Sequence, residues 1–278
     1  MEINKKIIEL LKDVKEKNPL VHHITNYVTV NDCANITLAI GGSPVMADDI
    51  EEVSDMVSLA STLVINIGTL NSRSVESMLA AGKRANELKI PVILDPVGAG
   101  ATPYRTQTAK RIINEVKLAV IRGNLSEIKI LYGIEAKIKG VDACESDSAD
   151  NNERAKAKKM AKVLANKFNN VVAITGAVDL ITDGKTLYTV ENGHKIMSKV
   201  TGTGCMCTSL IGSYLGAGDN KLIATLAGVV SMGIAGEIAY EGLDKSKDGT
   251  GTLKVKILDA IYNLSEVDII KRSKINEE

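Results

Sequence analysis

The residues with the clearest chemical potential form the run Val200-Thr201-Gly202-Thr203-Gly204-Cys205. No charged residue occurs between Met206 and Gly218, so a buried helix is expected to begin at or just before Cys205. The two glycines allow the backbone to approach a ligand, and the free N–H groups of a first helical turn attract anions such as phosphate. The same helix dipole would favour the thiolate of Cys205. A glycine-rich turn that merely leads into a core helix is an equally good interpretation of this run alone.

Polar residues that follow short apolar runs favour the ligand-binding interpretation. Asp95 follows one such run, and Arg122 follows another. Phosphoryl transfer needs N–H groups and a cation for phosphate oxygens, and carboxylates to hold Mg²⁺. Asn124 and Glu127 add a spacing that places both side chains on one side of a first helical turn, although this pattern is frequent by chance.

The elements that must position these residues are strands of a mostly parallel sheet. Short runs rich in Val and Ile lack the alternation of half-exposed strands, so they are expected to be buried on both faces: Leu63–Ile67, Val92–Leu94, Leu118–Ile121 and Val171–Ile174. Helical patterns at 72–88 and 104–116 lie between them, which predicts βαβ units and a doubly wound α/β fold. Ligands bind at the carboxyl ends of strands in such sheets. Strand ends need turn residues for structural reasons alone, and this would account for the glycines at these positions. It accounts less well for the charged residues Asp95 and Arg122.

Further elements are predicted on either side of these units. An amphipathic helix opens the chain, with Ile3, Ile7, Leu11 and Val14 on one stripe. Asp183-Gly184 between two strand-like runs predicts a hairpin. Three helices are expected over 205–215, 222–240 and 253–264, with Gly218 and Gly242 as C-caps of the first two. The polar stretch 145–152 is interpreted as a surface loop rather than a linker, so one domain over residues 1–278 is expected.

Composition argues against several classes of protein. Lys and Arg total 34, as do Asp and Glu, and aromatic residues are only 3% of the chain, so no nucleic-acid partner is expected. The N-terminus carries Glu2, Lys5 and Lys6, and no signal peptide is expected. The longest uncharged run, 222–236, is shorter than a membrane span, so no membrane partner is expected. The four cysteines lack paired metal spacing and are expected to be reduced thiols in the cytoplasm.

Other candidate motifs fail on their context. Asp183-Gly184-Lys185-Thr186 ends like a phosphate-binding P-loop, but Asp179 occupies the position of the first glycine and a hairpin is expected there. No G-x-G-x-x-G occurs, so the dinucleotide fingerprint is missing. His22-His23 could suggest a metal site, yet adjacent histidines point in different directions and a structural role is favoured.

At this point the chain resembles the ribokinase-like small-molecule kinases and, within them, the hydroxyethylthiazole kinases. The resemblance extends from about Pro19 to about Gly242. The segments that carry it are Pro19–Asn26, Gly42–Ala47, Asp95–Ala99, Arg122–Asn124 with Glu127, Ile174–Gly176 and Val200–Cys205.

The resemblance implies a three-layer ribokinase-like fold and ATP-dependent phosphorylation of 4-methyl-5-(2-hydroxyethyl)thiazole for thiamine synthesis. The roles that it implies fall into four groups. Asn26, Met46 and Gly202 would contact the thiazole. Arg122, Thr175 and Gly204 would contact ATP. Asp95 and Glu127 would hold Mg²⁺, and Cys205 would be catalytic. The resemblance also implies a homotrimer with sites between subunits.

One departure from the wider superfamily concerns the last position of the run Val200–Cys205, which is called the glycine loop below. Many ribokinase-like kinases have an Asp there as general base, whereas this chain has Cys205. Because a loose phosphoryl-transfer transition state asks little of a base, Cys205 is expected to orient the hydroxyl more than deprotonate it. The alternatives are a kinase for hydroxymethylpyrimidine or pyridoxal, a nucleotide-dependent dehydratase of the same fold, and a non-catalytic nucleotide sensor. Cys205 argues against the dehydratase, and the carboxylates Asp95 and Glu127 argue against the sensor.

Overall fold

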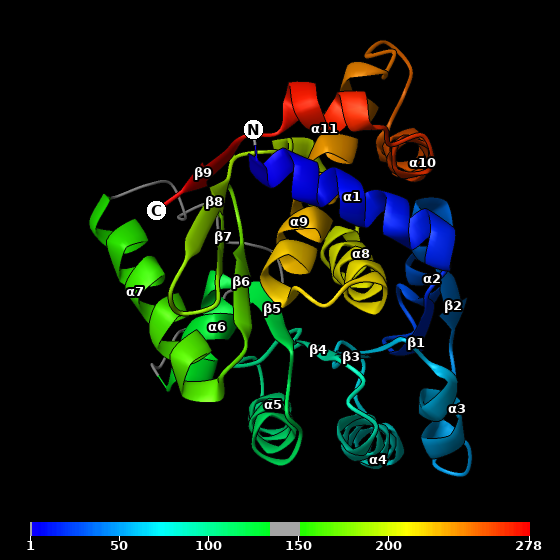
Figure 1. Cartoon of the computed structure of the whole chain (residues 1–278), viewed down its shortest axis with the longest axis vertical. Coiled ribbons are helices and arrows are strands. Elements are labelled where there is room, and N and C mark those ends of the chain that lie inside the picture. The colour runs from blue at the N-terminus through cyan, green and yellow to red at the C-terminus, as the bar shows by residue number, and fades with distance from the viewer. Residues whose placement is uncertain (1, 134–150) are drawn as a thin grey trace.

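The computed structural model describes residues 2–133 and 151–278. Within these residues, nine strands form one sheet in the order β2-β1-β3-β4-β5-β6-β7-β8-β9 (Figure 1). Neighbouring strands are parallel from β2 to β6, and the pairs from β6 to β9 are antiparallel. The strand bounds are β1 Leu20–Ile24, β2 Ser43–Val45, β3 Thr62–Asn66, β4 Val92–Asp95, β5 Val120–Asn124, β6 Val171–Thr175, β7 Asp179–Thr182, β8 Leu187–Val190 and β9 Ile275–Glu277.

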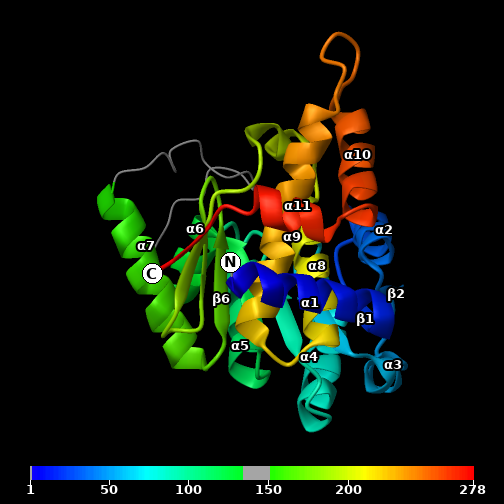
Figure 2. The same ribbon diagram turned by 45° about the horizontal axis from the view of Figure 1, so that its top comes forward.

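Helices cover both faces of the sheet, which gives the expected three-layer α/β architecture (Figures 1 and 2). One face carries α8 and α9, with α1, α2, α10 and α11 packed around them. The other face carries α3 to α7. The helix bounds are α1 Glu2–Lys17, α2 Val30–Ile40, α3 Val53–Leu59, α4 Ser72–Glu87, α5 Pro103–Glu115, α6 Leu125–Tyr132, α7 Asn151–Phe168, α8 Thr203–Ala217, α9 Lys221–Glu241, α10 Thr250–Tyr262 and α11 Glu266–Arg272, with a 3-10 helix at Lys195–Lys199.

Alternate residues of the central strands enter two separate hydrophobic cores. Val64, Ile93 and Val120 belong to the core beneath α8 and α9. Ile65 and Leu94 belong to the core beneath α4 and its neighbours. Both faces of these strands are therefore buried, which explains why their sequences are continuously apolar rather than alternating.

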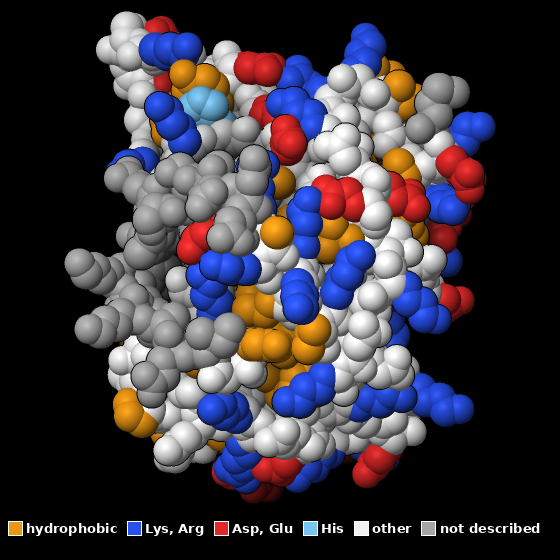
Figure 3. Space-filling view, turned by 90° about the vertical axis from the view of Figure 1, so that its left-hand side faces the viewer, with side chains coloured by type: hydrophobic (Ala, Val, Ile, Leu, Met, Phe, Trp, Pro, Cys, Tyr) orange, Lys and Arg blue, Asp and Glu red, His pale blue; other side chains and the backbone are white. Residues whose placement is uncertain are grey.

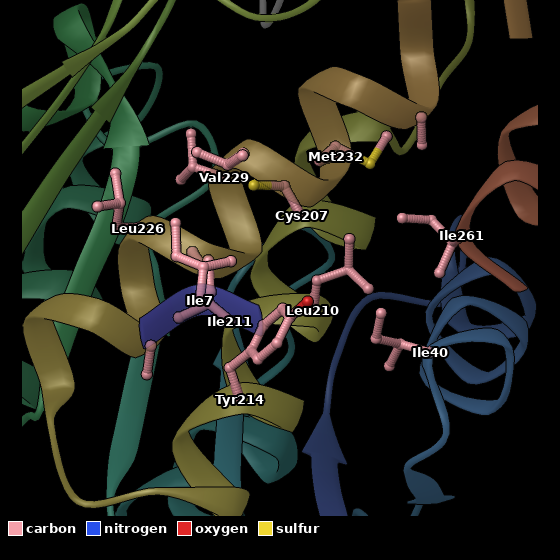
Figure 4. Packing of buried hydrophobic residues seen from close by; sticks show 14 of the residues in the cluster. Ile7, Ile40, Cys207, Leu210, Ile211, Tyr214, Leu226, Val229, Met232 and Ile261 are labelled. Atoms are coloured by element: carbon pink, nitrogen blue, oxygen red, sulfur yellow. The ribbon is translucent and has the colours of Figure 1, made fainter. Parts of the chain in front are cut away.

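Helix α8 lies very close to the sheet, because it carries glycine where it crosses β3. A Cβ at Gly212 would lie 2.7 Å from Cγ2 of Val64 and 3.3 Å from Cγ1 of Val21. Leu210, Ile211 and Tyr214 of the same helix pack among side chains of α1, α2, α9 and α10 (Figure 4). This packing leaves α8 little freedom to shift.

The predicted elements are confirmed, with small differences at their ends. The third of the four predicted strands begins at Val120 rather than Leu118, and the hairpin joins β7 to β8. Gly218 and Gly242 are the C-caps of α8 and α9, although neither adopts the left-handed conformation. Of the loop expected at 145–152, residues 145–150 lie outside the described residues. Residues 151 and 152 belong to α7, which begins at Asn151. Helix α9 has the length and apolar character of a membrane span, but 89% of its most apolar window is buried within the protein.

Candidate functional site

The glycine loop forms the start of α8, as predicted. Gly202 is the N-cap residue, with a φ of +88° that favours glycine. A Cβ at this position would also lie 2.7 Å from Cγ2 of Thr29. Because the helix begins at Thr203, the first-turn N–H groups have no partner within the helix and can bind an anion.

Gly204 allows a second group, the guanidinium of Arg122, to approach this loop. A Cβ at Gly204 would lie 2.7 Å from Nη1 of Arg122 and 3.0 Å from Nη2. Arg122 also donates a hydrogen bond from Nη2 to Oγ1 of Thr175. A cation and a helix N-terminus therefore face the same space, which is a suitable arrangement for phosphate oxygens.

The alternation within the strands brings four polar side chains to this side of the sheet. Asn66, Asp95, Arg122 and Thr175 lie an even number of residues beyond Val64, Ile93, Val120 and Ala173, which belong to the core beneath α8. Asn66 and Asp95 are also directly paired in the register of β3 and β4. The predicted convergence of Asp95, Arg122 and Thr175 is therefore present at the carboxyl edge of the sheet.

Asp95 is fully buried at the centre of this group. Its Oδ2 accepts hydrogen bonds from Nδ2 of Asn66 at 3.0 Å and from Oγ1 of Thr208 at 2.8 Å. The same oxygen lies 3.6 Å from Nη1 of Arg122. Its Oδ1 is buried without a hydrogen-bond partner among the described residues. Burial raises the pKa of Asp95, while the charge of Arg122 opposes that shift.

Glu127 lies in the capping box at the start of α6. Its Oε2 accepts from the N–H of Asn124, and the Asn124 side chain accepts from the N–H of Glu127. Its Oε1 accepts from the N–H of Gly98 at 2.8 Å, which ties α6 to the loop that follows β4. Burial and the nearby charge of Asp95 raise the pKa of Glu127 to about 7.

Cys205 lies in the first turn of α8, where two carboxamides face its sulfur. Nδ2 of Asn26 lies 3.4 Å from Sγ, and Nδ2 of Asn66 lies 3.3 Å from it. Burial and the charge of Asp95 nevertheless raise the pKa of this thiol. This direction is opposite to the one expected from the helix start, because burial and the charge of Asp95 both disfavour the thiolate.

Met46 is the predicted site residue that stands apart. It follows the edge strand β2 and is partly exposed. No hydrogen bond or ion pair of the described residues links β2 to the Asp95 group, although both lie at carboxyl ends of parallel strands. Asn26, in contrast, is buried and joins the group through Asn66.

Three residues of the site were missed by the sequence analysis. Asn66 lies inside the apolar run Leu63–Ile67 and is the last residue of β3, and Thr208 lies one turn into α8. Arg105, in the first turn of α5, donates to the carbonyls of Ile67 and Gly68 at 2.7 Å and of Val97 at 2.9 Å. It thus joins the loops that follow β3 and β4. Only Asn66 had a usable signal, namely its even spacing from Val64 at the end of a strand.

The two adjacent histidines lie inside the sheet, in agreement with a structural role. Nε2 of His22 lies 2.7 Å from the carbonyl oxygen of Ala47, and Nε2 of His23 lies 3.3 Å from Oγ1 of Thr37. The part of the chain that the structure describes holds no cluster of three or more His, Cys, Asp or Glu side chains suited to a metal.

A cavity opens beside Thr175, between α7 and the β6–β7 turn. Its lining is mainly apolar and consists of Leu125, Glu153, Arg154, Ala157, Ile174, Thr175, Gly176, Ala177, Val178 and Leu180. The face on this side of the molecule exposes apolar side chains between Lys and Arg side chains (Figure 3). A ligand that contacts Arg122 and Thr175 could therefore extend an apolar part into this cavity.

Asp179 is a buried carboxylate near this cavity, and it should make stability depend on pH. Its Oδ1 accepts from the N–H of Gly176 at 2.9 Å, yet burial raises its pKa to about 7. A raised pKa means that its contribution to stability is fully present below the unfolded value of 3.8 and is lost as the pH rises through about 7.

We therefore expect Asp179→Asn to be more stable than the wild type at pH 8 by about 1–2 kcal/mol. The asparagine keeps the oxygen that accepts from Gly176 but cannot ionise, so most of this advantage should vanish at pH 4.5. Urea unfolding at the two pH values measures the difference. Parallel pH dependence of the two proteins would contradict the assignment.

Comparisons with known proteins point to one family by sequence. The chain matches the model of the hydroxyethylthiazole kinase family over residues 11–267. It is 59% identical over 276 residues to the hydroxyethylthiazole kinase of Clostridium tetani, with 99% of each chain covered. It is 56% identical over 277 residues to that of Alkaliphilus oremlandii, with 100% of each chain covered.

Solved structures extend the comparison to the fold. The hydroxyethylthiazole kinase protein from Pyrococcus horikoshii superposes with a TM-score of 0.88 at 42% identity, with 99% of each chain covered. Pyridoxal kinase from Staphylococcus aureus, solved with AMP-PCP and pyridoxal, gives a TM-score of 0.61 at 16% identity, over 94% of this chain and 98% of the kinase. The second likeness shows the fold alone.

Proposed function

This chain belongs to the hydroxyethylthiazole kinase family, and on that premise we propose that it phosphorylates 4-methyl-5-(2-hydroxyethyl)thiazole with ATP. The hydroxyl oxygen of the thiazole attacks the γ-phosphorus, the bond to the β–γ bridging oxygen breaks, and ADP leaves. The hydroxyl proton departs to water or product phosphate. The observation that carries the proposal is the convergence of the α8 N-terminus, Arg122 and Asp95 on one space.

The nucleotide occupies the side of the site that faces β5 and β6. Arg122 and Thr175 contact the phosphates of ATP, and the N–H groups from Gly204 onward cradle the transferred phosphoryl group. The proximity of Gly204 to the guanidinium supports this pairing. The adenine then enters the apolar cavity beside Thr175.

The thiazole occupies the side that faces β1 and β2. Asn26 lies beside Cys205, and Thr29, which follows Asn26 in the segment between β1 and α2, lies against Gly202. Asn26 and Gly202 are therefore placed to line an acceptor pocket. Met46, at the end of β2, supplies its apolar wall. A neutral thiol at Cys205 then orients the hydroxyl rather than removing its proton.

Magnesium fits the carboxylates of this site. The buried Oδ1 of Asp95 lacks a donor, as expected of an atom that gains its partner when a cation or water binds. Glu127 already accepts two backbone N–H bonds, so it would hold the ion through water. When bound with ATP, Mg²⁺ neutralises charge on the β- and γ-phosphate oxygens.

A trimer with sites between subunits and a cytoplasmic location complete the proposal, with residues 1–278 as one kinase domain. Tyr27 and Val28, next to Asn26, are 79% and 57% exposed in the single chain. Exposed apolar side chains of this size are typical of a surface that a neighbouring subunit covers. Light scattering should therefore give the mass of three 29.6-kDa chains. A monomeric mass at assay concentrations would contradict the shared site.

The reaction is tested by ADP release with Mg-ATP and a panel of acceptors. The panel contains hydroxyethylthiazole, hydroxymethylpyrimidine, pyridoxal and no acceptor. We expect turnover with the thiazole at a kcat/KM well above that with the other alcohols. Preference for another alcohol would move the substrate assignment, and folded protein without any turnover would overturn the kinase proposal.

Cys205→Ala should impair the enzyme without abolishing it. Loss of an orienting hydrogen bond, rather than of a general base, is expected to lower kcat by about tenfold. Steady-state kinetics from pH 6 to pH 9 measure this, with Cys207→Ala as a buried control in the same helix. A loss beyond about 10³-fold would instead indicate a required base.

A further inference from the structure

Asn66 is the one uncharged side chain of the described residues that hydrogen-bonds to both Asp95 and Cys205. It is the last residue of β3 and is 2% exposed. Its Nδ2 donates to Oδ2 of Asp95 at 3.0 Å and to Sγ of Cys205 at 3.3 Å. It therefore lies between the side of the site proposed for Mg-ATP and the side proposed for the acceptor.

The orientation of this carboxamide is fixed by its other end. Oδ1 accepts from Nδ2 of Asn26 at 3.0 Å and from the N–H of Gly68 at 2.9 Å. Rotating the amide by 180° would place its oxygen against the Asp95 carboxylate and its NH₂ group against two donors. All of its hydrogen-bonding capacity is used in one arrangement, and none remains for a ligand.

The hydrogen bonds have a consequence for the thiol. Amides of Asn26 and Asn66 both point at the sulfur, so they occupy the region of its lone pairs. The S–H bond must then be directed away from both amides. Without Asn66, the sulfur loses one of the two donors that define its orientation.

We infer that Asn66 is a positioning residue that sets Cys205 relative to Asp95, and this rests on the proposed roles of both. Because protein groups use all of its hydrogen-bonding capacity, Asn66 acts through the two side chains to which it donates rather than by contact with a substrate. A purely structural Asn would satisfy the N–H of Gly68 and affect stability alone. A positioning Asn affects turnover, and it does so only while Cys205 is present.

A double-mutant cycle distinguishes the two roles. The proteins are the wild type, Asn66→Ala, Cys205→Ala and the double variant, each assayed at saturating Mg-ATP and thiazole. We expect Asn66→Ala to lower kcat by about tenfold or more in the wild-type background and by only about twofold in the Cys205→Ala background. The KM for ATP should stay within about twofold, because Arg122 and the loop are unchanged.

Two further variants protect the test from a folding defect. Asn66→Asp keeps the size and the acceptor oxygen but removes both donations, so it should lower kcat at least as much as Asn66→Ala. Asn71→Asp is the matched control, since an exposed N-cap of α4 accepts Asp as well as Asn and should retain full activity. Thermal unfolding of each variant verifies that it is folded at the assay temperature.

The outcomes separate this inference from the proposed function. Wild-type kcat for folded Asn66→Ala and Asn66→Asp would overturn the inference, and so would equal losses in the two Cys205 backgrounds. In both cases the proposed role of Cys205 would stand if Cys205→Ala itself is impaired. Full activity of Cys205→Ala would instead overturn that role and the inference together.

Discussion

Asp95→Asn is expected to lower kcat by about 10²–10³-fold while the protein stays folded. Asp95 is buried, lies 3.6 Å from Nη1 of Arg122 and has one oxygen without a partner. The amide can still accept from Thr208 or Asn66, but it cannot supply negative charge to a cation or to the guanidinium. Stopped or coupled ADP-release assays at saturating Mg-ATP measure the loss.

The control for this variant is Asp219→Asn, which makes the same change at an exposed position after α8. It should leave kcat within about twofold, because surface substitutions away from structural features have small effects. Circular dichroism and thermal unfolding of both variants establish that each is folded. A kcat for Asp95→Asn within tenfold of the wild type would remove Asp95 from the chemistry.

Gly204→Ala should lower kcat/KM for ATP by about 10²-fold through a steric effect alone. The new Cβ would lie 2.7 Å from Nη1 of Arg122, a distance that real Cβ atoms do not tolerate. Arg122 must then move away from the α8 N-terminus, and it also loses its contact with Thr175. Nucleotide affinity, measured by calorimetry without acceptor, should fall together with turnover.

Gly251→Ala is the matched glycine substitution for this test. Gly251 lies in the first turn of α10, just as Gly204 lies in the first turn of α8, but nothing lies within 4 Å of a Cβ there. Alanine is the better helix former, so this variant should be fully active and slightly more stable. Unchanged ATP binding by Gly204→Ala would show that Arg122 does not need its position against the loop.

The framework of the site could be predicted because it follows from local patterns. The apolar runs are too short to be buried helices, so they are interpreted as strands, and polar residues directly follow them in the chain. Parallel strands place their carboxyl ends at one edge, so Asp95, Arg122 and Thr175 had to lie near one another. The start of α8 was likewise predicted within two residues.

The chemistry inside the framework depends on tertiary packing, and there the sequence was a weaker guide. The start of a helix is visible in the sequence, whereas the burial and the charge of Asp95 that raise the pKa of Cys205 come from the packing of other elements. Asn66 was read as part of an apolar strand, although its spacing from Val64 places it with Asp95. Arg105 joins the site through backbone carbonyls of the loops after β3 and β4, and these contacts leave no pattern in the sequence.

The close contact between α8 and β3 means that packing in the hydrophobic core sets the position of the residues that α8 contributes to the proposed site. Gly212 holds the helix against Val64, and Thr208 and Cys205 lie one and two turns before it on the same rigid rod. A methyl group added at Gly212 would clash with Val64 and press the helix away from β3, although Gly212 is no part of the proposed site. Substitutions at this helix–strand contact are therefore expected to change turnover as well as stability.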